Sequence, residues 1–100
     1  MLEELLAAGH SGAEYDAWLL IDDAHGFGVL GEGRGAVAEA GCSDAVSLQI
    51  GTLSKAVGAY GGFLAAAKPV VELMISRARS LVYATALPPT VVAASLAALV

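Results

Sequence analysis

Short apolar runs, separated by glycine-rich and polar stretches, are the dominant pattern along this chain. The run at residues 17–21 is continuous and does not alternate with polar residues, which is typical of a strand covered on both faces of a sheet. Residues 45–52 and 61–67 predict a second and a third strand, with a loop between them. Residues 81–85 predict a further short strand.

The first segment has helical spacing. Residues 1–8 predict the end of an amphipathic helix, because Leu2, Leu5 and Leu6 fall on one side of it. The small and polar residues that follow, at positions 9–16, predict a turn before the first strand.

Three further helices are predicted after the first strand. Residues 35–41 predict a short helix that ends at its last glycine, and in residues 69–80 Pro69 occupies the first turn, where its missing N–H costs nothing. Residues 90–100 are apolar on nearly every face and predict a buried helix. The order of these strands and helices predicts an α/β architecture.

Composition changes this picture in one respect. Of the 100 residues, 57% are hydrophobic before the 12 glycines are counted, and 15% are charged. Ordinary globular domains are roughly 45–50% apolar and about 25% charged. The chain therefore has few polar residues to cover an exterior, and we expect a slice from the interior of a larger protein.

Several partner classes are disfavoured by the sequence. The apolar run at residues 81–100 contains two prolines and small polar residues, and residues 1–10 have no basic region, so neither a spanning helix nor a secretory signal is predicted. A net charge of −5 without a Lys/Arg cluster argues against nucleic acid. The single cysteine, Cys42, excludes an internal disulfide and fits a reducing, cytoplasmic setting.

A dense polar patch, "DDAH" at residues 22–25, directly follows the first predicted strand. Asp22, Asp23 and His25 are metal-ligand types, but three ligands in four residues do not converge easily from one strand end, so no metal site is predicted. Residues 26–31, "GFGVLG", match a dinucleotide fingerprint by letter alone, because no helix start follows them. The patch also resembles a helicase box, but the chain has no phosphate-cradling loop of the required pattern.

A second polar patch surrounds Lys55, in a glycine-bounded loop that also holds Thr52 and Ser54. Apolar surroundings disfavour the charged form of a lysine and make it a nucleophile toward carbonyls. A pyridoxal-phosphate site needs such a lysine, a carboxylate for the pyridine nitrogen and hydroxyls for the phosphate. Lys55, Asp22 and Thr52 can fill these roles at strand ends, where open α/β sheets bind ligands.

Three segments in order, "WLLIDDAHGFGVLGEGRG", "GTLSKAVGAYGGFLAA" and "RSLVYATALPP", resemble the α-oxoamine synthases. These pyridoxal-phosphate enzymes condense an amino acid with an acyl-CoA or acyl-carrier thioester and release CO2. The resemblance implies an acyltransferase of fold type I, whose large domain has a mostly parallel sheet with flanking helices. Within the family, the motifs are most similar to the members of the biotin pathway, which use L-alanine and a pimeloyl thioester.

The resemblance implies a role for five residues. Asp22 would hold the pyridine nitrogen, His25 would hydrogen-bond the ring oxygen, and Thr52 would bind the phosphate. Lys55 would form the Schiff base with the cofactor and later carry the α-proton. Thr85 matches a position that reaches the phosphate of the neighbouring subunit, which implies a homodimer. Asp23 receives no role in catalysis and is expected either to support the neighbouring site residues from behind or to cap the loop.

Parts of the family pattern are not found in these residues, namely an upstream glycine-rich loop, the residue stacked on the ring and a downstream arginine for the substrate carboxylate. We therefore expect residues 1–100 to be a fragment of the cofactor-binding large domain, without a complete second domain and inactive alone. Two alternatives stay open at this point. One is a sister synthase that acts on glycine, and the other is a non-catalytic remnant that binds a full-length subunit.

Overall fold

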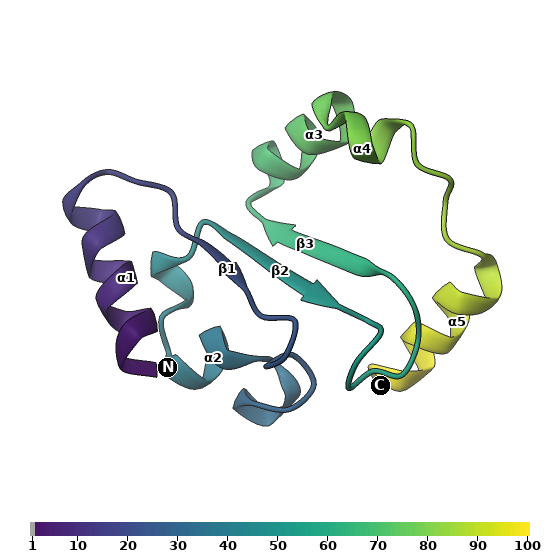
Figure 1. Ribbon diagram of the computed structural model, residues 1–100, viewed down its shortest axis with the longest axis horizontal. Helices are drawn as coiled ribbons and strands as arrows, with labels where there is room; N and C mark the ends of the chain where they lie inside the picture. The colour runs from purple at the N-terminus through teal and green to yellow at the C-terminus, as the bar shows by residue number, and fades with distance from the viewer. Residues whose placement is uncertain (1) are drawn as a thin grey trace.

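The computed structural model describes residues 2–100, apart from the side chains of residues 2, 3, 5, 6, 9 and 11. Met1 and the side chains of Leu2, Leu5 and Leu6, which were expected to line one side of the first helix, therefore lie outside the described part of the chain. The described residues form a three-stranded sheet with helices at both of its ends (Figure 1).

The sheet consists of β1 (Leu20–Asp22), β2 (Leu48–Thr52) and β3 (Gly62–Ala66), with β2 in the middle. The three strands that the apolar runs predict are thus confirmed. The prediction that the first strand begins at residue 17 and is covered on both faces was wrong, because β1 begins at Leu20 and Leu20 is 50% exposed. β1 pairs with β2 in parallel, whereas β2 pairs with β3 antiparallel, so this part of the sheet is mixed. The connection between β2 and β3 is a loop that reverses the chain, which is why their pairing is antiparallel.

The register of the strands brings three strand ends together. Asp22 pairs with Ile50, and Thr52 pairs with Gly62. The carboxyl ends of β1 and β2 and the start of β3 consequently lie at one edge of the sheet (Figure 1). This edge carries the polar residues on which the sequence prediction depends.

The helices agree with the sequence prediction in the middle of the chain. The predicted short helix ends at Gly41, whose backbone is left-handed with φ of 64° and whose N–H bonds back to the carbonyls of the last turn. Pro69 lies in the first turn of its helix, as predicted. The helices are α1 (Leu2–Glu14), α2 (Ala36–Ala40), α3 (Lys68–Arg77), α4 (Arg79–Val82) and α5 (Pro89–Ala98), with short 3₁₀ turns at Gly31–Gly33 and Ser43–Ala45.

Two local predictions were wrong. Residues 9–14 continue helix α1, so the predicted turn at residues 9–16 is mostly helix. The chain turns only at Asp16, which has φ of 50°, and the N–H of Ala17 bonds back to the carbonyl of Gly12. Residues 81–85 form no strand, because the N–H groups of Leu81 and Val82 bond to the carbonyl of Ala78 and continue as α4. A strand needs a neighbouring strand for its N–H groups, and these N–H groups are already used.

The predicted burial of the last helix was also wrong. α5 is reached by a long irregular segment and lies beyond the sheet (Figure 1), and Ser95 is its only buried residue. Leu96 is 62% exposed and Leu99 is 53% exposed. The apolar character of a helix predicts that it will be covered, but within the described residues no element covers this one.

The hydrophobic core of the described residues is small. It consists of Ala36, Val37 and Cys42, with partly buried neighbours that include Ile21 and Val46. The accessible surface is 6969 Å², whereas a compact monomer of 10.0 kDa exposes about 5,200 Å². Several large apolar side chains are exposed, among them Trp18 at 69%. None of the helices within residues 2–100 is long and apolar enough to cross a bilayer.

Candidate active site

A cleft of about 370 Å³ opens at the edge of the sheet where the three strand ends meet. Its lining combines a carboxylate, two aliphatic hydroxyls, a phenol and glycine backbone. The lining residues are Asp22, Ala24, Ile50, Gly51, Thr52, Ser54, Tyr60, Gly61 and Gly62. Two of the residues selected from the sequence, Asp22 and Thr52, are thus brought into one cleft from strands that are distant along the chain.

Asp22 is the last residue of β1 and its side chain is exposed to the cleft. One carboxylate oxygen accepts a hydrogen bond from the N–H of Ala24 at 3.1 Å, so the side chain folds over the turn that follows the strand. The other oxygen has no recorded partner among the described residues, and it can accept a proton donor that enters the cleft.

Thr52 is half-buried at the end of β2. Its hydroxyl lies 2.7 Å from the hydroxyl of Ser54, donates to the carbonyl of Gly61 at 3.0 Å and accepts from the N–H of Ser54 at 3.2 Å. These bonds hold both hydroxyls at the mouth of the loop. Ser54 is a cleft residue that received no role from the sequence, although its spacing of two from Thr52 was a signal for it.

Lys55 follows this hydroxyl pair in a tightly closed loop. The N–H of Gly58 bonds to the carbonyl of Lys55 at 2.9 Å, and the N–H of Leu53 bonds to the carbonyl of Gly61 at 2.8 Å. The side chain of Lys55 is exposed and does not line the cleft. The apolar surroundings expected for this lysine are therefore not provided by residues 2–100, because the loop projects beyond the strand ends.

His25 and Thr85 also lie outside the cleft lining. His25 is exposed, in a turn closed by hydrogen bonds from the N–H groups of Gly26 and Phe27 to the carbonyl of Asp23 at 3.2 and 2.9 Å. Thr85 is exposed in the irregular segment between α4 and α5. The described residues thus bring Asp22 and Thr52 together and leave the other three outside the cleft lining.

Asp23 is the residue of the patch that the structure buries, with 3% of its surface exposed. One oxygen of its carboxylate accepts from the N–H of Ala36 at 2.9 Å and from the side-chain amide of Gln49 at 2.8 Å. The expected loop-capping function of Asp23 agrees with these bonds. They also connect the residue to the first turn of α2 and to the middle strand, which its sequence position did not reveal.

The glycines after the patch have steric reasons within the chain itself. A Cβ on Gly26 or on Gly35 would overlap the Asp23 carboxylate, and a Cβ on Gly28 would lie 2.7 Å from the Cβ of Ala56. Gly28 thus packs against the residue that follows Lys55. The glycines let the loop close over Asp23 and against the lysine loop.

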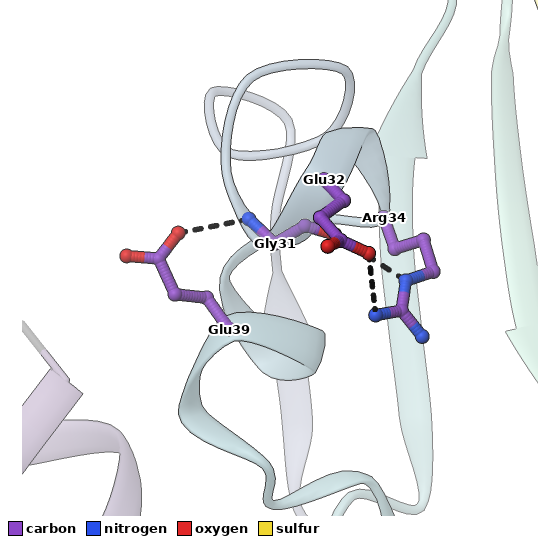
Figure 2. Close-up of polar contacts among 4 residues, drawn as sticks. All are labelled: Gly31, Glu32, Arg34 and Glu39. Atoms are coloured by element: carbon purple, nitrogen blue, oxygen red, sulfur yellow. Dashed lines mark hydrogen bonds and ion pairs between the residues drawn. The ribbon is translucent and has the colours of Figure 1, made fainter.

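The loop at residues 26–35 is further held by polar contacts at its outer end. The Glu39 carboxylate accepts from the N–H of Gly31 at 2.8 Å, and Arg34 lies 3.5 Å from the Glu32 carboxylate (Figure 2). Glu32 has left-handed backbone with φ of 57°, which is uncommon outside glycine. On the side nearer the sheet, Phe27 packs edge-to-face on Phe63 of β3 with ring centroids 4.8 Å apart.

Within residues 2–100, no group of three or more His, Cys, Asp or Glu side chains is close enough to hold a metal ion. Within the "DDAH" patch, the side chain of Asp23 is buried, whereas those of Asp22 and His25 are exposed.

Comparison with known proteins identifies the family. The model of the aminotransferase class I and II family matches residues 2–99. The chain belongs to this family. Among relatives, 8-amino-7-oxononanoate synthase of Beijerinckia indica is 51% identical over 98% of the chain, and that of Methylocella silvestris is 59% identical over 87%. The chain spans about a quarter of the length of these relatives.

Solved structures of this aminotransferase family share the fold. Serine palmitoyltransferase of Sphingomonas wittichii is 38% identical with a TM-score of 0.83, covering 90% of this chain and 23% of that one. A serine palmitoyltransferase from S. paucimobilis with bound PLP–myriocin aldimine is 31% identical with a TM-score of 0.83, over the same shares. The 8-amino-7-oxononanoate synthase of Francisella tularensis is 33% identical with a TM-score of 0.74, covering 91% of this chain and 28% of that one. The family resemblance and the fold type predicted from the motifs are confirmed.

The contact between Gly28 and the lysine loop yields a stability prediction. Gly28→Ala adds both backbone strain, at φ of +81°, and the close contact with Ala56, whereas Gly33→Ala adds only strain, at φ of +86° with open space. We expect Gly33→Ala to lower the free energy of unfolding by about 1–2 kcal/mol. Gly28→Ala should lower it by about 1–3 kcal/mol more, because the two loops are forced apart. Urea unfolding of both variants measures the difference.

Ala56→Gly serves as the control for this contact, since it removes the methyl group that the new Cβ of residue 28 meets. In a double-mutant cycle, the additional loss of Gly28→Ala should disappear in the Ala56→Gly background. Equal losses for Gly28→Ala and Gly33→Ala, or no coupling with position 56, would contradict the contact.

Proposed function

We propose that this chain is part of the cofactor-binding large domain of a synthase that condenses L-alanine with a pimeloyl thioester. The products are 8-amino-7-oxononanoate, CO2 and CoA or a carrier, and the reaction belongs to biotin biosynthesis. The observation that carries this proposal is the identity of 51% and 59% to relatives named for that product, over nearly the whole chain. The carboxylate and the hydroxyl pair in one cleft support it.

The donor set of the cleft fits pyridoxal phosphate. Asp22 places a carboxylate at one part of the lining, and Thr52 and Ser54 place hydroxyls at another. Ala24 and Ile50 add apolar lining that suits an aromatic ring. An acid for a ring nitrogen, hydroxyls for a phosphate and apolar groups for the ring are what this cofactor requires.

Each proposed role follows from the chemistry of the side chain. When bound, pyridoxal phosphate supplies an aldehyde that captures amines and a ring that withdraws electrons. The Asp22 carboxylate holds a proton on the ring nitrogen by charge and hydrogen bonding. Thr52 donates its hydroxyl to the phosphate, exchanging its present bond to the carbonyl of Gly61. His25 donates to the ring oxygen, and Lys55 anchors the cofactor and moves the α-proton of the amino acid.

Thr85 is assigned to the phosphate of a neighbouring subunit, so the proposal includes a homodimer. Its exposed position outside the cleft lining supports a role across an interface. The exposed apolar side chains on the same part of the chain, such as Tyr83 at 80% exposure, are compatible with a surface that a further part of the protein or a partner covers. We also propose a cytoplasmic location, which fits a chain with a single cysteine and no internal disulfide.

The choice of amino acid is tested by substrate comparison in the complete protein that contains this chain. Purified protein is incubated with the pimeloyl thioester and either alanine, glycine or serine, and thiol release is measured. Alanine should give the highest kcat/KM. Preference for glycine would instead place the protein with the sister synthases. A protein that takes none of the three, but purifies together with a full-length synthase, would be a non-catalytic binding subunit.

Lys55→Ala tests the cofactor anchor. The variant should lose the visible absorption of covalently attached cofactor, because no other lysine stands in the loop between β2 and β3. Lys68→Ala is the matched control, since Lys68 is an exposed lysine paired with Glu72 at the start of α3. The measurement is the absorption spectrum after dialysis and borohydride reduction. Persistence of a reduced, covalently bound cofactor in Lys55→Ala would refute the assignment.

Asp22→Asn tests the partner of the ring nitrogen. The amide keeps the size and can still accept from the N–H of Ala24, but it no longer holds a proton on the ring. We expect the variant to retain cofactor and to lose about 100-fold or more in kcat. Asp44→Asn, at an exposed acid of the Ser43–Ala45 turn, is the control. Unchanged turnover in Asp22→Asn would remove Asp22 from the proposed site.

A further inference from the structure

Asp23 is a buried acid that the proposed reaction does not use. Its neighbours in the chain, Asp22 and Ala24, line the cleft, while its own carboxylate points away from it, into the loop. A buried carboxylate is costly unless it is well bonded, so its presence beside the cleft requires a reason.

The hydrogen bonds of Asp23 connect four parts of the molecule. Its N–H donates to the carbonyl of Ile50 at 2.8 Å, which extends the pairing of β1 with β2 by one residue. Its carboxylate accepts from the N–H of Ala36, in the first turn of α2, and from the side chain of Gln49 on β2. Its carbonyl accepts from the N–H groups of Gly26 and Phe27 and so closes the turn that contains His25.

Little free space surrounds the Asp23 carboxylate. Gly26 and Gly35 flank it from the two ends of the loop, and a Cβ on either would overlap its oxygens. The N–H of Ala36 and the amide of Gln49 reach the same oxygen from the helix and from the sheet. The side chain of Asp23 thus connects the turn both to α2 and to β2.

We propose that Asp23 is a positioning residue for Asp22 and His25. It is not in the cleft, but it fixes the end of β1 and the following turn to α2 and β2, and so sets the direction of the two side chains beside it. This inference rests on the proposed function, because it concerns the geometry of the residues that would hold the cofactor ring. Small displacements of such residues cost large factors in rate.

The test compares three variants of the complete protein. Asp23→Asn keeps an oxygen that can accept from both Ala36 and Gln49, and Asp23→Ala removes it. Gln49→Leu leaves the carboxylate in place but removes one of its two donors, so it remains informative if Asp23→Ala does not fold. Asp44→Ala is the control for the loss of an exposed acid. The readouts are kcat, KM for the amino acid, melting temperature and the pH titration of the visible absorption of the bound cofactor.

We expect Asp23→Ala to lower kcat about 100-fold with little change in KM, and to shift the midpoint of the absorption titration by about one pH unit. Gln49→Leu should lower kcat about tenfold, as the loss of an outer hydrogen-bond partner commonly does. Asp23→Asn should keep kcat within about tenfold of the parent, because its hydrogen bonds can be retained.

Two outcomes would overturn the inference. If Asp23→Ala and Gln49→Leu lower the melting temperature but leave kcat and the titration midpoint unchanged, the residue only stabilises the loop. If Asp23→Asn loses as much activity as Asp23→Ala, the negative charge of Asp23 affects the reaction, and its hydrogen bonds do not act by positioning Asp22 and His25. Failure of the proposed function is distinguishable from both, since the parent protein itself would then show either no cofactor absorption or no thiol release with alanine.

Discussion

The parallel pairing of β1 with β2 is the interaction on which the site depends. It places Asp22 opposite Ile50, so that the carboxyl ends of two strands whose paired residues are 28 positions apart along the chain come to one edge. β3 then pairs antiparallel with β2 and returns its first residue to Thr52 at the same edge. The cleft with its acid and its hydroxyls is a consequence of this register, because a shift by one residue would direct Asp22 to the other face of the sheet.

The loop after β1 is organised around a buried carboxylate. The carboxylate of Asp23 bonds to the start of α2 and to the middle strand, while glycines on both sides let the chain close over it. Gly28 and the Phe27–Phe63 contact join the same loop to the lysine loop and to β3. A polar centre of this kind specifies one geometry, because a displaced carboxylate would leave donors unpaired in the interior.

Outside this loop, many apolar side chains are exposed and the hydrophobic core is small. Trp18 is 69% exposed and α5 is largely uncovered, although the composition is that of a protein interior. The chain spans about a quarter of the length of its relatives, and the fold shared with solved serine palmitoyltransferases covers 23% of the first of those chains. Lys55 is exposed for the same reason, because residues 2–100 do not form the apolar surroundings that would remove water from its side chain.

The sequence by itself determined the strands, the loop that carries Lys55 and the family, because short apolar runs and turn glycines act locally and the motifs are specific. It could not determine that residues 81–82 form a helix, or that α5 is uncovered, because such outcomes depend on which neighbours are available for pairing and packing. For Asp23 the sequence predicted a loop cap or a support for the site residues, but it did not reveal the partners of the carboxylate. Its partners, Ala36 and Gln49, lie 13 and 26 residues away, and only the tertiary structure brings them to one oxygen.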